Sequence, residues 1–253
     1  MKNILQNNTI VLTQIRSGGT VLDSLLSLIH KKKNIEFHNF WQYVPDAGSP
    51  KELEQQFEKI YDKIALLNVK WNIRLIIPEL INLNNAGYIT TPVISKLFKK
   101  LITPAVKIFL YRQDIEDWFL SYIIAEKTQV FHVNDINNNL NLDKSFDVNE
   151  NEIIKFLDTL LLTKNVFNLI EDDKTVYIEY NDLLNKKIFC EELGITFTDN
   201  DNTFLETDNN GYPVKKLYSK NEKINKINNW SKISTILHNY CNYLGFNNSF
   251  FYD

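Results

Sequence analysis

The chain is poor in cysteine and histidine, and this shortage excludes several classes of protein. Two Cys and four His in 253 residues are too few for a disulfide framework, and no Cys or His pair has the spacing of metal ligands. We therefore expect no metal site. Cys190 and Cys241 are expected to be reduced thiols that behave as small buried hydrophobes.

Long apolar runs and an excess of positive charge are also missing. No window approaches the roughly 18 to 20 uninterrupted apolar residues of a membrane helix, and the start of the chain lacks the apolar stretch of a signal peptide. These absences favour a cytoplasmic protein without a membrane span. The net charge of −3 and the pI of about 5.9 argue against a nucleic-acid partner.

Arginine is the most informative shortage. Of the 28 basic residues only three are arginine, at Arg16, Arg74 and Arg112. Lysine serves most solvated surface positions, whereas planar, bidentate binding of a phosphate or sulfate favours arginine. The three arginines are therefore candidate ligands of an anion.

The chain has ample core material, with 44% hydrophobic and 13% aromatic residues. Apolar runs typical of buried parallel strands alternate with runs whose apolar residues recur every three or four positions, as in helices. We expect an α/β protein with a single domain, residues 1–253, in which helices flank a central parallel sheet in three α/β/α layers. The expected strands are 9–15, 71–77, 105–111 and 175–180, and the expected helices are 21–29, 50–67, 93–101, 115–131, 152–170, one ending at 193–194, and 229–244.

Two helix ends are marked by charged residues. Asp114 is a candidate N-cap with Asp117 at the third helical position, so a helix is expected directly behind Arg112. The run Lys31–Lys33 is expected to close the first helix, where cations meet the negative end of its dipole.

The segment from Thr13 to Thr20 carries the strongest chemical signal. Its centre, Arg16-Ser17-Gly18-Gly19, lies between an expected strand and an expected helix. A loop of small residues in that place lets backbone N–H groups converge on an anion, and the positive end of the helix adds to the attraction. The segment predicts a phosphate cradle, with a plain glycine turn as the alternative. It lacks the Walker spacing of an ATP-hydrolysing P-loop.

A second segment begins at Arg112, at the end of the expected strand 105–111. Ser121, Ala125 and Thr128 follow at spacings that place them on one face of the next helix. Such a stripe of small residues would let a nucleotide approach closely. The alternative is that Arg112 forms a surface ion pair with Asp114 or Glu116.

Together these segments resemble the sulfotransferases that use 3′-phosphoadenosine-5′-phosphosulfate (PAPS), most of all the bacterial and phage carbohydrate type represented by the trehalose and nodulation-factor enzymes. The first matches the family's loop of Pro, Arg or Lys, Ser, Gly, Ser or Thr, and Thr, with Ile15 and Gly19 as departures. The second matches the family's Arg and Ser, here nine residues apart where animal cytosolic members have eight.

The resemblance implies the P-loop-like sulfotransferase fold and a set of ligands. The 5′-phosphosulfate would be held by the loop and the 3′-phosphate by Arg112 and Ser121. A basic segment before Trp230 would close over the nucleotide, unless it is simply a solvated face. The implied loop ligands are Arg16, Ser17, Gly18, Gly19 and Thr20. The basic segment contains Lys215, Lys216, Lys220, Lys223 and Lys226, and Lys216 is the one expected to bind the nucleotide.

The implied reaction is transfer of a sulfuryl group from PAPS to a hydroxyl of a carbohydrate or small molecule, with 3′,5′-adenosine bisphosphate (PAP) as product and no metal. Arg16 would act in catalysis as well as in binding. The family's base position falls at Glu36, with His38 as the rival; two residues apart in an extended segment, both would face one side. Arg74 would reach the reacting groups or form a buried ion pair.

Two other functions stay open. A nucleotide kinase would share the strand, loop and helix but needs a P-loop lysine and Mg²⁺ ligands, which the sequence does not show in place. A non-catalytic relative would keep Arg16 and Arg112 and bind PAPS or PAP without turnover.

Overall fold

The computed structural model divides into two compact units. The first comprises Met1–Tyr111 and Asn165–Asn202, and the second comprises Arg112–Lys164 and Thr203–Asp253. The single domain expected from the sequence stays a prediction. The structure describes residues 7–14, 16–19, 21–22, 25–26, 33–36 (backbone alone), 49, 51–52, 55–56, 58–59, 62, 66, 71–77, 98–129, 144–183 and 219–246.

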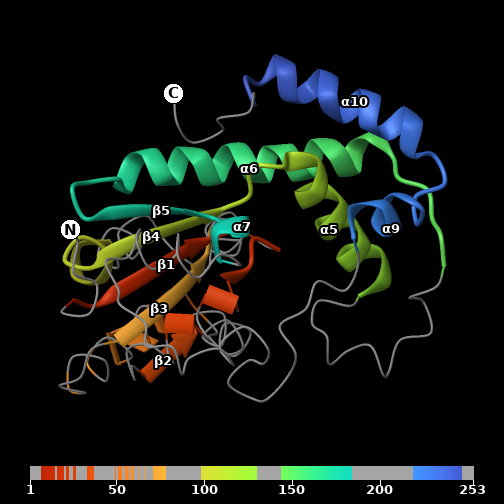
Figure 1. Ribbon diagram of the computed structural model, residues 1–253. Coiled ribbons are helices and arrows are strands. Elements are labelled where there is room, and N and C mark those ends of the chain that lie inside the picture. Colours follow the sequence, from red (N-terminus) through yellow and green to blue (C-terminus); the bar gives the residue numbers. More distant parts are fainter. Residues whose placement is uncertain are drawn as a thin grey trace, which may run out of the picture. The chain divides into compact units, whose positions relative to one another are not determined.

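A five-stranded parallel sheet forms the core of the first unit (Figure 1). The order across the sheet is β2-β3-β1-β4-β5, so β1 lies at the centre. The chain continues from β1 to the β3 side of the sheet and from β4 to β5 on the other side. In open parallel sheets, ligands bind at the carboxyl ends of the strands where the connections diverge in this way, here β1 and β4. The strands are β1 (Thr9–Thr13), β2 (Lys33–Glu36), β3 (Trp71–Ile76), β4 (Val106–Tyr111) and β5 (Thr175–Glu179).

The central strands are buried on both faces. Every residue of β1 and β4 is buried, as is every residue of β3 except the last. Phe109 of β4 stacks on Phe167 with ring centroids 4.0 Å apart and meets Tyr177 of β5 edge-on at 5.1 Å. The near-continuous apolar runs of β1 and β4 are what a parallel sheet covered on both faces requires.

One lysine lies fully inside the first unit. Lys107, on β4, is 1% exposed, and its Nζ forms an ion pair with Asp172 at 2.8 Å. Nζ also donates hydrogen bonds to the carbonyl oxygens of Ala105 and Ile102, at 3.2 and 3.3 Å. Burial by itself would raise the pKa of Asp172, but hydrogen bonds from Lys107 and from the Lys174 backbone hold that pKa below its usual value of 3.8.

The elements described in the second unit are helices. Phe156 of α6 (Glu150–Ile170) contacts the rings of Trp118, Phe119 and Tyr122 of α5 (Ile115–Thr128), with centroids 6.3, 5.3 and 5.3 Å away. The two helices therefore share one aromatic core, and α6 ends in the first unit. The remaining described elements are α9 (Lys220–Ile224) and α10 (Trp230–Tyr243) in the second unit, and η3 (Phe98–Ile102) and α7 (Tyr180–Leu183) in the first.

Most of the expected elements are confirmed. The four expected strands correspond to β1, β3, β4 and β5, and the helices expected at 115–131, 152–170 and 229–244 correspond to α5, α6 and α10. The chain thus has an α/β fold in which helices flank a parallel sheet. Cys241 is buried as expected, whereas Cys190 lies outside the described residues. None of the described helices is long and apolar enough to cross a membrane.

Two expectations are wrong. Lys33 was expected in the last turn of a helix, but it begins β2, a strand that the sequence pattern did not reveal. Because β2 lies at the edge of the sheet, its charged residues are compatible with a strand and hide its apolar pattern. Tyr180 was expected to end β5, but it begins α7. The Glu179 carboxylate accepts a hydrogen bond from the Asn181 backbone N–H at 2.5 Å and so favours the turn.

Replacing the buried lysine tests its role. Lys107→Met is expected to lower the free energy of unfolding by about 1 to 3 kcal/mol, because two buried carbonyl groups lose a donor. Because the pKa of Asp172 is lowered in the folded state, the part of the loss due to its ion pair is present above pH 3.8 and fades as the pH falls further. Urea unfolding at several pH values measures both effects. Lys174→Met, on the exposed turn nearby, is the control and should change little; equal losses in the two variants would contradict the assignment.

Candidate anion-binding site

The loop after β1 is held in a tight turn. Ser17 is fully buried, and its backbone N–H and its hydroxyl both donate to the carbonyl oxygen of Gln14, at 3.2 and 2.7 Å. Arg16 has a φ of 65° and Gly18 a φ of 96°. The Leu22 N–H donates to the Gly18 carbonyl oxygen at 3.1 Å, so a helical turn starts directly after the loop. The described residues between 13 and 22 therefore show the strand end, the turn and the start of a helix that the sequence predicts there.

Both glycines of the loop lie against large side chains. A Cβ atom on Gly18 would lie 2.5 Å from Cδ2 of Tyr180, and the positive φ would strain any other residue. A Cβ atom on Gly19 would lie 2.9 Å from Cδ of Arg74 and 3.1 Å from Cγ2 of Thr13. The sulfotransferase loop that this segment resembles has Ser or Thr at the position of Gly19. The space that such a side chain would need is taken by Arg74.

Arg74 is a buried arginine beside the loop. It lies on β3, is 6% exposed, and its Nη1 is 3.4 Å from the position of a Cβ atom on Gly19. Its register partners are Val11 of β1 and Glu36 of β2. The strand therefore places Arg74 at the loop and, in the sheet, next to the residue predicted to be the base. Thr20, His38 and Lys216 and the side chain of Glu36 lie outside the described residues, so their roles stay predictions.

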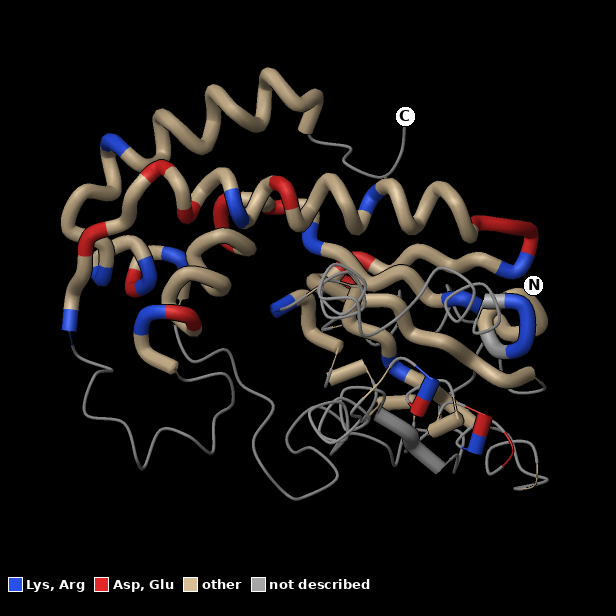
Figure 2. The backbone as a smooth tube through the Cα atoms, turned by 180° about the vertical axis from the view of Figure 1, so that it is seen from behind, with Lys and Arg blue, Asp and Glu red and all other residues tan. Residues whose placement is uncertain are grey.

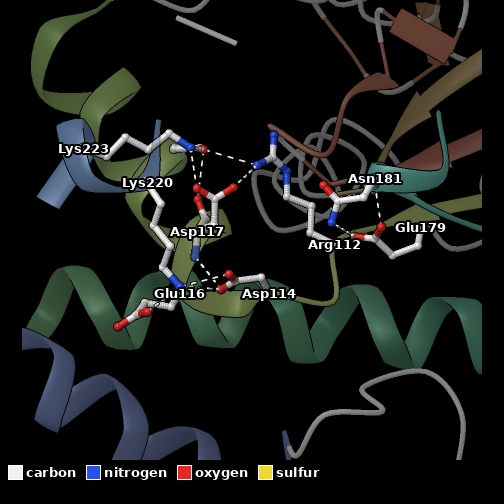
Figure 3. A network of polar contacts seen from close by, with 9 residues as sticks. Arg112, Asp114, Glu116, Asp117, Glu179, Asn181, Lys220 and Lys223 are labelled. Carbon is white, nitrogen blue, oxygen red and sulfur yellow. Dashed lines mark hydrogen bonds and ion pairs between the residues drawn. The ribbon is translucent and has the colours of Figure 1, made fainter. Parts of the chain in front are cut away.

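Arg112, Asp117, Ser121 and Lys223 form a buried polar cluster in the second unit, here called the Arg112 cluster. Figure 3 labels three of its members, Arg112, Asp117 and Lys223. The Asp117 carboxylate accepts a hydrogen bond from Nη1 of Arg112 at 2.9 Å and one from Nζ of Lys223 at 2.6 Å. The Ser121 hydroxyl accepts from the same two groups, at 3.3 and 2.7 Å, and donates to the Asp117 carbonyl oxygen at 2.9 Å. All four residues are at most 8% exposed.

The cluster answers two questions that the sequence left open. Arg112 and Ser121 do lie within hydrogen-bonding distance, although nine residues separate them. Arg112 also forms an ion pair, but its partner is the buried Asp117 rather than Asp114 or Glu116. The roles of Asp117 and Lys223 were missed, since the sequence marked Asp117 only as a helix-start residue and Lys223 only as one of several lysines. A buried lysine cannot be distinguished from a solvated one in a charged run.

Lys220 forms a second, exposed set of ion pairs at the start of α5. It binds Asp114 at 2.9 Å and Glu116 at 2.6 Å, with side chains that are 37 to 47% exposed. Burial alone would lower the pKa of Lys220, but the hydrogen bonds to Glu116 and Asp114 raise it above its ordinary value. Such exposed pairs contribute little stability. Figure 2 shows basic and acidic residues interspersed along α5, α6 and α9.

Local capping fixes the two helices that carry the cluster. Asp114 accepts the Asp117 N–H at 2.8 Å and thereby caps α5. Ser219 and Glu222 form a reciprocal capping box at the start of α9. These caps set the turns on which Asp117 and Lys223 lie. Within the part of the chain that the structure describes, no group of three or more His, Cys, Asp or Glu residues could hold a metal ion.

Substituting Gly18 tests the packing of the loop. Gly18→Ala is expected to lower the free energy of unfolding by roughly 2 to 4 kcal/mol, because it combines backbone strain with overlap on Tyr180. Gly245→Ala is the matched control, since Gly245 also has a positive φ but has no atom within 4 Å of the added carbon; it should cost only about 1 kcal/mol. Thermal unfolding compares them, and equal losses would show that Tyr180 does not constrain the loop.

Compared with known protein families and with curated proteins, the chain finds no match.

Proposed function

We propose that the chain is a PAPS-dependent sulfotransferase that transfers a sulfuryl group to a hydroxyl of a carbohydrate or another small acceptor, and that it has the sulfotransferase fold. One observation carries the proposal. The glycine loop leaves the central strand β1 with positive φ at Arg16 and Gly18, and a buried arginine, Arg74, lies against it. A compact loop in that topological position, beside arginine, has the chemistry of a site for a phosphate or sulfate ester.

The nucleotide's two anionic ends are assigned to different residues. Arg16 and the loop residues from Ser17 to Thr20 bind the 5′-phosphosulfate, and Arg74 supplies a second cation where the family's loop has a hydroxyl. Arg112 and Ser121 bind the 3′-phosphate. This assignment is supported by the 3.3 Å hydrogen bond from Nη1 of Arg112 to the Ser121 hydroxyl and by the burial of both residues. Buried hydrogen bonds to a charged acceptor are among the stronger polar interactions in proteins.

The proposed reaction is an in-line displacement at sulfur. The acceptor oxygen forms a new bond to sulfur while the bond between sulfur and the bridging oxygen of PAPS breaks, and PAP leaves with that electron pair. Glu36, or His38 in its place, takes the acceptor's proton. Arg16 and Arg74 stabilise the charge that develops on the bridging oxygen and the leaving phosphate. The register of β2 and β3, which pairs Glu36 with Arg74, supports placing the proton acceptor near the transferred group.

Ligand binding tests the proposed nucleotide. PAP at many times its dissociation constant is expected to raise the melting temperature without any metal, because it binds the native state alone. Arg112→Lys should weaken PAP at least tenfold and leave adenosine 5′-phosphosulfate, which has no 3′-phosphate, nearly unchanged, because lysine cannot form the bidentate contact. Calorimetric titration measures both affinities. An equal response to ATP with Mg²⁺ would favour the kinase, and equal weakening of both ligands would remove Arg112 from the 3′-phosphate.

Turnover tests the proposed base. Glu36→Gln keeps the size of the side chain but removes its basic oxygen, so kcat should fall by roughly 10²- to 10⁴-fold while PAP affinity stays the same. His38→Asn is the control and should lose much less. The pH profile gives an independent measurement, since a carboxylate base loses activity as the pH falls through about 4.3 and a histidine through about 6.5. The reverse pattern of losses would assign the base to His38, and PAP binding without turnover of any acceptor would favour the non-catalytic relative.

A further inference from the structure

The Arg112 cluster contains its own anion. Asp117 receives a hydrogen bond from each of two cations, and both Arg112 and Lys223 also contact the Ser121 hydroxyl. The carboxylate therefore lies where it gathers the donors around one serine. Three of these four groups come from α5 and the residues just before it, whereas Lys223 comes from α9, more than a hundred residues later in the chain.

We propose that Asp117 is an internal counter-ion that holds this site ready when it is empty, and that a phosphate monoester binds by replacing Asp117 as the acceptor for Arg112 and Lys223. This inference rests on the proposed function, because the monoester is then the 3′-phosphate of PAPS. It adds Lys223 to the phosphate ligands. It also makes Asp117 a positioning residue that determines which anions the site accepts.

Charge explains the selectivity. Among the four side chains of the cluster, the two cations Arg112 and Lys223 both pair with Asp117, so these four side chains together carry one net positive charge. A phosphate monoester carries about 1.5 to 2 negative charges at pH 7 and offers three acceptor oxygens. The monoester can accept the hydrogen bonds that Arg112 and Lys223 donate to Asp117, and its second negative charge can neutralise the net positive charge of the cluster. A 3′-hydroxyl offers too little charge to compete with Asp117, so nucleotides without a 3′-phosphate leave the cluster in its empty arrangement.

Because the cluster is buried, removing the charge of Asp117 should change the stability of the protein by a measurable amount. The side chains of Arg112 and Lys223 are each 8% exposed and that of Asp117 is 11% exposed. Removing one partner of a buried ion pair leaves charge without compensation and destabilises a protein strongly. If Asp117 loses its charge, an external anion that enters the cluster should restore the lost stability. An ion-pair network that serves only to join α9 to α5 would gain no such dependence on one kind of anion.

The matched pair Asp117→Asn and Asp114→Asn tests the proposal. Both remove one negative charge from the start of α5, but Asp114 is exposed and asparagine caps helices about as well as aspartate. In potassium chloride, Asp117→Asn should melt roughly 5 to 15 °C below the unsubstituted protein. Inorganic phosphate at the same ionic strength should recover most of that loss, while Asp114→Asn and the unsubstituted protein respond much less. An equal response of all three proteins would show that Asp117 is structural and overturn the proposal.

Nucleotide affinity gives the second measurement. Asp117→Asn should bind PAP about tenfold more tightly than the unsubstituted protein, because the competing carboxylate is gone, and should bind adenosine 5′-phosphosulfate as before. Weaker PAP binding in this variant would overturn the proposal. Recovery by inorganic phosphate without any preference for PAP would instead preserve the anion site and reject the proposed function.

A second variant covers the case in which Asp117→Asn does not fold. Lys223→Gln leaves Arg112 and Asp117 as a balanced pair, so the protein should remain folded. It should lose at least tenfold in PAP affinity and little in adenosine 5′-phosphosulfate affinity. An unchanged ratio of the two affinities would remove Lys223 from the phosphate ligands and overturn the proposal.

Discussion

Close packing around the loop after β1 is the constraint on which the candidate site depends. Tyr180 lies against Gly18 and Arg74 lies against Gly19, so neither position has room for a side chain. β1 itself is fixed between β3 and β4 by parallel pairing along its whole length. The conformation of the loop is therefore set by the sheet and by two large side chains. A binding loop fixed in this way loses little conformational entropy when a ligand arrives.

Arginine is rare in the chain but is concentrated at the candidate sites. In a chain with 25 lysines, two of the three arginines are buried beside glycine or serine at the two candidate anion sites. Arginine keeps its charge when buried and presents several fixed donors, whereas lysine offers a single flexible ammonium group. Lys107 and Lys223 show what a buried lysine needs here, since each forms an ion pair with an aspartate. Each of these two buried lysines is thus compensated by an acidic side chain.

The sequence was informative where one local pattern determines the outcome. The apolar runs of β1 and β4, the N-cap at Asp114 and the glycine loop were all recognisable, because each depends on residues that are neighbours in the chain. β2 was missed because an edge strand tolerates lysine and glutamate. The packing of Arg74 on Gly19 and the pairing of Asp117 with Lys223 were missed for another reason, since both join residues more than fifty positions apart. Contacts between such distant residues leave no periodic pattern in the sequence.

The central place of β1 also has a consequence for the way the chain folds. β1 is the first strand in the sequence, yet its two neighbours are β3 and β4, so Thr9 pairs with Asn72 on one side and Val106 on the other. Such non-local pairing raises the contact order and slows folding. During synthesis, the apolar strand at residues 9–13 has no complete place in the sheet until residue 111 has left the ribosome. Its exposure in that interval makes it a segment that chaperones would bind and that aggregation would begin from.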